Sequence, residues 1–398
     1  MTATDIGFKP RIASIDLLRG TIMIIMALDH VRDYFHADSF VFRPLDLSHT
    51  SVALFFTRWV THFCAPGFVF LAGTSAYFIS QRKSTSELSL FLLTRGLWLV
   101  FLDLLVVNFG WSFNINFTFF TFNVLWALGG SMIAMAALLY LPEPLILVTG
   151  VVMVAGHNLL DGCHVSGQNM LAFGWALLHE PNVFNVGAKS LSVGYPLVPW
   201  IGVMALGYCC GRLYERTYDA GYRRTLLVLL GGSMVIAFVI LRYFNLYGDA
   251  LHWSKQASAM FSFLSFIRTS KYPASLLFVL MTVGPLLLFL ALTEEIDGWA
   301  ARLVSVYGRV PLFYYLVHIY VIHLLALLAA EFTAGYDWRD WILTGPDPPW
   351  EAGFKGYGFS LAITWLIWVC LVVALYPLCK WYDSYKQRNK GRWWLSYV

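Results

Sequence analysis

Ten long apolar runs constrain the fold of this chain more than any other feature. A helix needs about 20 apolar residues to cross the hydrocarbon core of a bilayer. Hydrophobic residues make up 59% of the 398 and charged residues only 13%, a balance far from that of a soluble domain. The sequence therefore predicts an all-α polytopic membrane bundle, with residues 1–398 forming one integral-membrane domain. The runs lie at roughly 17–35, 52–80, 89–108, 120–141, 143–158, 196–214, 224–243, 274–293, 308–330 and 358–380.

A further apolar stretch at 168–180 is too short to cross comfortably, so ten or eleven transmembrane helices are expected. Basic residues then predict the orientation of the chain in the membrane, because loops rich in Lys and Arg favour the cytoplasmic side. If ten helices cross and 168–180 does not, all the basic segments fall on one side, and both termini are expected in the cytoplasm. These segments are the arm at 1–15, the loops at 81–88 and 212–224, and the tail at 381–398.

Charged residues interrupt the first apolar run, RIASIDLLRGTIMIIMALDHVRDYFH at 11–36. At about 100° per residue, one side of a helix carries a stripe of six residues. A buried ion pair between Asp16 and Arg19 would explain part of it, but paired charge seldom extends along a whole helix. We expect the stripe to line a polar interior rather than to face lipid. Its members are Asp16, Arg19, Met23, Met26, His30 and Asp33.

Other polar residues fall at matching depths in later runs. His62 lies near the middle of the second run, before a Cys64-Ala-Pro-Gly67 sequence that permits a break in the helix. His318 lies near the middle of the ninth run, beside Tyr314 and Tyr315. For His62, a core histidine bonded to a neighbouring carbonyl is an equally good interpretation.

A third polar group, His157-Asn158-x-x-Asp161, lies where the fifth run reaches the outer face. On spacing alone, this group and Asp29-His30-x-x-Asp33 would allow a metal ion, but each holds too few ligands, so no metal is expected. No HExxH, P-loop, GxSxG or GxGxxG context is present, and no nucleic-acid-binding signature appears. The six cysteines show no C-x-x-C spacing.

Several ordered blocks carry a family resemblance. Arg11-x-x-Ser14-x-Asp16-x-x-Arg19-Gly20, followed by an apolar run ending in Asp29-His30, resembles the opening of the transmembrane acyltransferase superfamily. Five later blocks resemble its bacterial branch related to heparan-alpha-glucosaminide N-acetyltransferase, and the resemblance covers nearly the whole chain. These blocks are DYFH at 33–36, THFCAPGFVFLAGTSAYF at 61–78, GHNLLDG at 156–162, YPLVPWIGVMALGYCCG at 195–211 and YGRVPLFYYLVHI at 307–319.

The resemblance implies a multi-pass acetyltransferase of the bacterial inner membrane. Acetyl-CoA would supply the acetyl group from the cytoplasm, and an amine or hydroxyl of an amino sugar, envelope glycan or small metabolite would receive it outside. The superfamily's histidine maps onto His30 and its arginine onto Arg19. In the heparan-acetylating relatives the active histidine corresponds best to His36, and asparagine stands where this chain has His30, so both histidines remain candidates.

Within that chemistry, a histidine would accept the proton of the acceptor, or would carry the acetyl group as a covalent intermediate. Asp33, one turn from His30, would orient the imidazole. The remaining expected roles divide by depth in the bundle. Arg19 and Arg11 would bind the CoA phosphates, His62 would lie along the donor path, His318 and Tyr314 would bind the thioester oxygen, and His157, Asn158 and Asp161 would lie on the substrate side.

Two other functions fit the same stripe. One is a transporter or channel that carries a proton or small polar solute without acyl chemistry. The other is a catalytically inactive relative that serves in membrane assembly. Expected partners of the leading hypothesis are acetyl-CoA, a small-molecule or glycan acceptor and membrane lipid, with no nucleic acid; a homodimer is an open alternative to a monomer.

Overall fold

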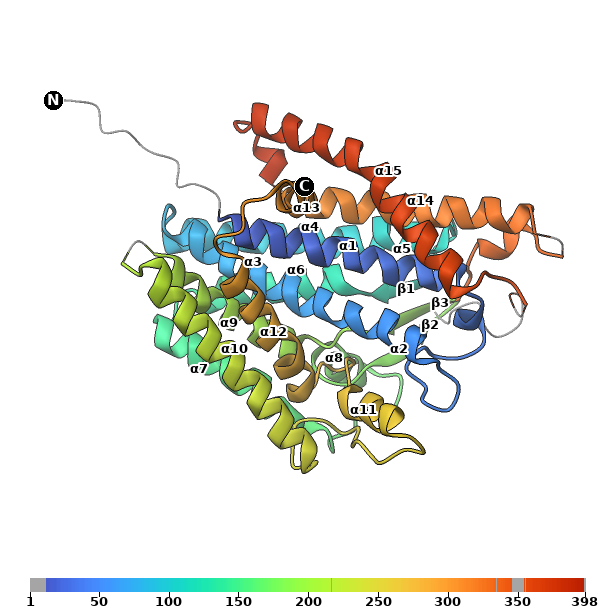
Figure 1. Cartoon of the computed structure of the whole chain (residues 1–398), viewed down its shortest axis with the longest axis horizontal. Coiled ribbons are helices and arrows are strands. Elements are labelled where there is room, and N and C mark those ends of the chain that lie inside the picture. Colours follow the sequence, from blue (N-terminus) through green and yellow to red (C-terminus); the bar gives the residue numbers. More distant parts are fainter. Residues whose placement is uncertain (1–11, 216, 334, 346–353, 355, 397–398) are drawn as a thin grey trace.

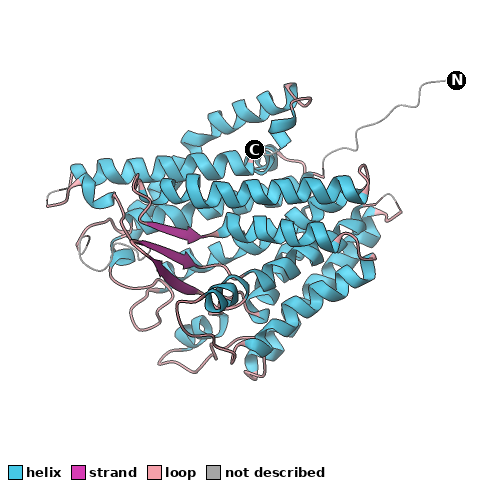
Figure 2. Cartoon of the chain, turned by 180° about the vertical axis from the view of Figure 1, so that it is seen from behind, coloured by secondary structure: helices cyan, strands magenta, loops and turns pink. Residues whose placement is uncertain are grey.

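The fold is a bundle of membrane-length helices with a small sheet at one end (Figures 1 and 2). The computed structural model describes residues 12–215, 217–333, 335–345, 354 and 356–396. Its helices are α1 (Ala13–Phe35), α2 (Val52–Trp59), α3 (Cys64–Ser80), α4 (Thr85–Phe101), α5 (Asn108–Ser112), α6 (Val124–Leu138), α7 (Glu143–Gly156), α8 (Met170–Leu178), α9 (Leu197–Gly211), α10 (Ala220–Tyr243), α11 (Ala259–Ile267), α12 (Leu276–Thr293), α13 (Trp299–Arg309), α14 (Pro311–Glu331) and α15 (Leu361–Arg388). Its strands are β1 (Phe119–Phe122), β2 (Asn182–Val186) and β3 (Lys189–Val193).

Every predicted apolar run contains a helix. Among the described residues, eight helical segments are long and apolar enough to cross a membrane. The first run forms α1, whose 23 residues include two arginines and three aspartates, and the fourth forms α6, which has only 15 residues. The prediction of an all-α polytopic membrane protein is confirmed, and the chain is a multi-pass membrane protein. The eight segments are Val52–Ser80, Thr85–Ser112, Glu143–Leu160, Leu197–Tyr214, Ala220–Tyr243, Leu276–Thr293, Pro311–Glu331 and Leu361–Arg388.

Two of these segments contain an irregular joint. Between α2 and α3 the chain tightens into a 3-10 turn at Val60–Phe63. Pro66 has no N–H, so the carbonyl of His62 cannot receive the helical hydrogen bond from that position. Between α4 and α5 the chain widens into a π-helix at Leu102–Val107.

The three strands form a sheet in the order β1-β3-β2, with β1 parallel and β2 antiparallel to β3. Its first strand corrects one boundary, because residues 120–122 of the expected run at 120–141 belong to β1 and the helix α6 begins only at Val124. The stretch 168–180 contains α8, which packs on the sheet through Ala172, Ala176, Phe184 and Val193. At nine residues, α8 spans about 14 Å and is too short to cross the bilayer.

Helix α1 lies inside the bundle, in contact with α3, α12, α13, α14 and α15. Glycines allow the closest approaches: a Cβ on Gly20 would lie 2.1 Å from the Val304 carbonyl oxygen, and one on Gly308 would lie 2.0 Å from that of Asp16. The α3–α4 and α9–α10 connections lie at the same end of the bundle as the start of α1, on the left of Figure 1. The sheet and the connection at 36–51 lie at the opposite end, on the right.

Candidate active site

A cavity of about 1130 Å³ opens at the end of the bundle that carries the sheet. Its wall combines the last turns of α1, the connection after it, the 3-10 joint before α3, α5, the sheet and the segment at 268–272. Five cationic and three acidic side chains line it, so the charge of the lining is positive on balance. Lining residues with polar or aromatic side chains include His30, Arg58, His62, Trp111, Lys271 and Tyr315.

His30 lines the cavity and contacts a second histidine, His318. Its Nδ1 lies 2.7 Å from Nε2 of His318, and Nδ1 of His318 lies 2.8 Å from the carbonyl oxygen of Tyr314. A carbonyl only accepts, so Nδ1 of His318 carries a proton, and the Nε2 of the neutral ring accepts the N–H of His30. This assignment leaves the lone pair of His30 on Nε2, the nitrogen not bonded to His318.

Aromatic rings fix the orientation of this histidine pair. Trp111 meets the His30 ring edge-on, with ring centroids 4.8 Å apart, and Tyr314 stacks on His318 at 5.1 Å. His318 is fully buried on α14 and does not line the cavity. It therefore supports His30 from behind, while His30 lines the cavity.

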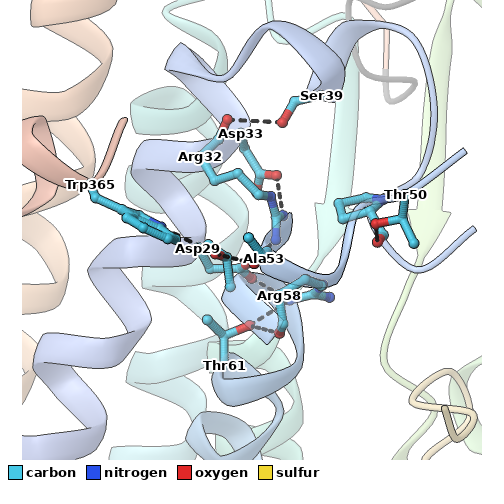
Figure 3. Close-up of polar contacts among 11 residues, drawn as sticks. Asp29, Arg32, Asp33, Ser39, Thr50, Ala53, Arg58, Thr61 and Trp365 are labelled. Carbon is cyan, nitrogen blue, oxygen red and sulfur yellow. Dashed lines mark hydrogen bonds and ion pairs between the residues drawn. The ribbon is translucent and has the colours of Figure 1, made fainter. Parts of the chain in front are cut away.

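Beside His30, four charged residues form a cluster at the end of α1 (Figure 3). Asp29 pairs with Arg32 at 2.6 Å and also with Arg58. Arg32 bonds Asp33 at 2.5 Å, and only 3% of its side chain is exposed. Charge buried to this degree is tolerated when it is paired. The cluster joins α1 to α2 and fixes the cationic wall of the cavity.

Further hydrogen bonds hold the same corner together. Ser39 donates to the carbonyl of Arg32 at 3.0 Å, and Arg58 donates to the hydroxyl of Thr61 at 2.9 Å. Trp365 of α15 donates its indole N–H to Thr57 of α2 at 3.1 Å. Figure 3 shows Arg32, Ser39, Arg58, Thr61 and Trp365 near Asp29; they come from α1, α2, α15, the connection after α1 and the 3-10 joint before α3.

The sequence-predicted residues His30, Asp33 and His62 all line this cavity. The expected partner of His30 differs, however, because Asp33 bonds Arg32 and the described partner of His30 is His318. His62 is buried in the 3-10 joint, and its Nδ1 has no hydrogen-bond partner within the part of the chain that the structure describes. His318 and Tyr314 were expected to bind the thioester oxygen, but their polar contacts described above are with His30 and with each other.

His36 lies outside the cavity lining. Its Nδ1 donates to the carbonyl of Phe359 at 3.1 Å, and its Nε2 lies 3.4 Å from Asp38. Burial lowers the pKa of the His36 imidazole, an effect that the Phe359 carbonyl and Asp38 partly oppose. His36 thus joins the end of α1 to the segment before α15.

Arg19, one of the two arginines expected to bind CoA, lies far from this end. Arg19 donates to Ser75 at 3.1 Å, to the Gly308 carbonyl at 3.3 Å and to Asp16 at 3.4 Å. It lies near the opposite end of α1, roughly 16 Å along the helix from His30. Arg11 lies outside the described residues. His157, Asn158 and Asp161 form a separate group that does not line the cavity.

Sequence reasoning missed several lining residues. Arg58 interrupts the second apolar run, so the test applied to Arg19, charge within an apolar segment, would have found it. Lys271 and Trp111 carried no such signal, because each reaches the cavity through tertiary packing from a distant segment. Tyr315 was noted beside His318 but was given no role at the site.

Comparison with known proteins gives one family match. The family model described as heparan-alpha-glucosaminide N-acetyltransferase, catalytic, matches residues 11–234. This range covers more than half of the chain and includes α1 with His30, the joint with His62 and the sheet. No curated protein matches the sequence.

Proposed function

This chain belongs to the heparan-alpha-glucosaminide N-acetyltransferase family of membrane acyltransferases, and on that premise we propose that it transfers an acetyl group from cytoplasmic acetyl-CoA to an amine or hydroxyl outside the membrane. The observation that carries the proposal is the 2.7 Å contact of His30 with His318 at the cavity wall. It gives His30 a fixed tautomer and an available lone pair, which a general base requires. We further propose that the membrane is a bacterial inner membrane.

In the proposed step, the acceptor nitrogen or oxygen attacks the thioester carbonyl of acetyl-CoA. His30 Nε2 accepts the proton that the acceptor loses. The C–S bond then breaks, and His30 Nε2 donates this proton to the leaving CoA thiolate. The products are an acetylated acceptor and free CoA, and the histidine returns to its starting state. His318 is a positioning residue, because it touches His30 rather than the reacting atoms.

A covalent route uses the same nitrogen. His30 Nε2 would attack the thioester first, and CoA would leave as the thiolate when the C–S bond breaks. The acceptor would then attack the acetyl-imidazole, the bond from the acetyl carbon to Nε2 would break, and the thiolate would take the proton that the acceptor loses. Both routes need His30 neutral at the start, with Nε2 free and Nδ1 bonded to His318. Trapping an acetylated His30 with acetyl-CoA in the absence of acceptor would distinguish the covalent route from direct transfer.

The cationic wall supports either route. Negative charge develops on the thioester oxygen during attack, and fixed cations in a site shielded from water stabilise it. We assign this role to Arg58 and Lys271, which line the cavity and reach it from different segments. The excess of positive charge also favours an acceptor that carries an anionic group.

The donor must reach His30 from the other end of the bundle. We propose that Arg19 binds a CoA phosphate there and that the pantetheine arm follows α1 toward the cavity. The bonds of Arg19 to Ser75, Gly308 and Asp16 would then hold its guanidinium at the inner end. Replacing Arg19 with alanine should weaken acetyl-CoA binding while leaving the histidine pair in place.

The test uses the purified full chain in detergent or nanodiscs with acetyl-CoA and two acceptors, glucosamine for an amine and methyl glucoside for a hydroxyl. His30→Ala should lower the release of free CoA by about 10²–10⁴-fold, the usual contribution of a general base, while acetyl-CoA binding is retained. His36→Ala is the matched comparison and should keep most activity. A wild-type preparation that neither binds nor consumes acetyl-CoA would refute the proposal, and loss of turnover in His36→Ala alone would move the catalytic role to that residue.

A further inference from the structure

A second polar cluster lies apart from the cavity and joins two segments. His157 is the first residue of the 3-10 turn at His157–Leu160 that follows α7, Asp161 comes directly after that turn, and His179 caps the end of α8. One ligand atom from each of the three lies within 4.8 Å of the others. Nε2 of His179 is 3.4 Å from a carboxylate oxygen of Asp161. From spacing along the sequence, His157 and Asp161 could be grouped but His179 could not, because it lies 18 residues beyond Asp161.

His157 is the residue of this cluster whose surroundings indicate a missing ligand. It is only 2% exposed, and neither ring nitrogen makes a hydrogen bond to any of the described residues. The backbone of Ala274 lies nearby, but no well-formed hydrogen bond joins the two. A polar group buried without a partner is costly and rare, and it indicates an ion, a water or a strained functional site.

We propose that His157, Asp161 and His179 bind one divalent transition-metal ion of the zinc class. Two imidazoles and one carboxylate form a ligand set that Zn²⁺ and its neighbours prefer. With metal–ligand bonds of about 2.0–2.2 Å, ligands of a tetrahedral site lie about 3.3 Å apart. The His179–Asp161 separation already meets this value, and a small shift of the His157 ring would bring the third ligand into range.

A further residue holds the carboxylate in place. Asn158 donates its amide N–H to the second oxygen of Asp161 at 2.9 Å, and its own carbonyl accepts the backbone N–H of Leu276 at 2.9 Å. Such outer contacts orient metal ligands and raise affinity. The ion would therefore join the end of α7 to α8, which packs on the sheet, and through Asn158 to the start of α12.

The site would stabilise the end of the bundle that carries the cavity. With three protein ligands, it leaves a fourth position for water. The proposal does not depend on acyl transfer, since none of the three residues lines the cavity. Its test therefore measures metal binding itself.

The experiment titrates Zn²⁺, and separately Co²⁺, into the metal-stripped full chain, with Cys163→Ser as the common background because that exposed thiol also binds metals. One equivalent should bind, Co²⁺ should give the visible absorption of a tetrahedral site, and the melting temperature should rise with metal concentration. His179→Ala should abolish all three effects. The matched control is His164→Ala, which removes a 68% exposed histidine from the same segment and should behave as the background does.

Two milder variants keep the test decisive if His179→Ala folds poorly. Asp161→Asn should lose the equivalent of bound metal, and Asn158→Ala should weaken affinity by about 10–100-fold, as the loss of an orienting contact does. Failure of the background protein to bind one equivalent would overturn the proposal. So would unchanged affinity in folded His179→Ala or Asp161→Asn, or binding that requires Cys163 instead.

Discussion

At the scale of single residues, the two rings of the histidine pair have different tasks. The Tyr314 carbonyl fixes the proton of His318 on Nδ1, and His318 in turn fixes the proton of His30 on Nδ1. Asp29 is adjacent to His30 in sequence, but its carboxylate is occupied by Arg32 and Arg58. The pair thus orients a neutral imidazole without a carboxylate partner, unlike a triad that places an acid behind its histidine.

This arrangement predicts how substitutions at His318 will behave. His318→Ala should lower turnover strongly, since His30 loses the acceptor that sets its tautomer, while acetyl-CoA affinity should change little. His318→Gln should restore part of the activity, because its side-chain oxygen can accept the same N–H. The measurement is CoA release across pH 5.5–8.5 together with acetyl-CoA binding. A role in packing alone would predict equal losses in both variants and an unshifted pH profile.

At the scale of helices and strands, local hydropathy was sufficient to find the crossing segments. Each apolar run contains a helix, because backbone groups in a bilayer must be satisfied within the segment itself. The sheet was not predicted, since β1 has four residues that continue directly into an apolar run and pairs with residues about 70 positions away. A pairing at that separation leaves no local periodicity to detect.

The candidate site likewise contains residues that local sequence patterns predict and residues that they do not. His30 and His62 were found because each interrupts an apolar run, and both line one cavity, whereas Asp16, Arg19 and Met23 of the stripe on α1 are not among its lining residues. Lys271 and the contact of His318 with His30 depend on how separate helices pack, which no local pattern encodes. Asp33, one helical turn after His30, was expected to bond the imidazole of His30. Its carboxylate instead forms an ion pair with the guanidinium of Arg32.

Helix packing gives a prediction at this scale. Gly73 of α3 meets α9 so closely that a Cβ would lie 2.0 Å from the Met204 carbonyl oxygen. Gly73→Ala should therefore force α3 and α9 apart, and the melting temperature should fall by several degrees. Gly232→Ala in α10 is the control, because a Cβ there meets nothing within 4 Å and alanine favours a helix over glycine by roughly 1 kcal/mol. Equal melting temperatures for the two variants would contradict this account of the α3–α9 contact.

At the scale of the whole molecule, the bundle has two unlike ends. The connections that carry basic residues gather at one end, and the cavity, the sheet and the histidine–aspartate cluster lie at the other. Helix α1 connects the ends, with Arg19 near one and His30 near the other. The proposed transfer of an acetyl group across the membrane would need this polarity, because its donor and acceptor would arrive from opposite sides.

Thiol labelling in intact cells tests which end faces outward. Cys163, in the connection after α7, is exposed, and a membrane-impermeant maleimide should label it from outside, because positive charge holds the other end in the cytoplasm. In the Cys163→Ser background, His49→Cys should label in the same way, since residue 49 lies in the connection at the cavity end. Lys83→Cys, in the α3–α4 connection, should react only after the cells are permeabilised. Labelling of Lys83→Cys in intact cells, with protection of Cys163, would reverse the orientation and place the cavity in the cytoplasm, where an outside acceptor could not reach His30.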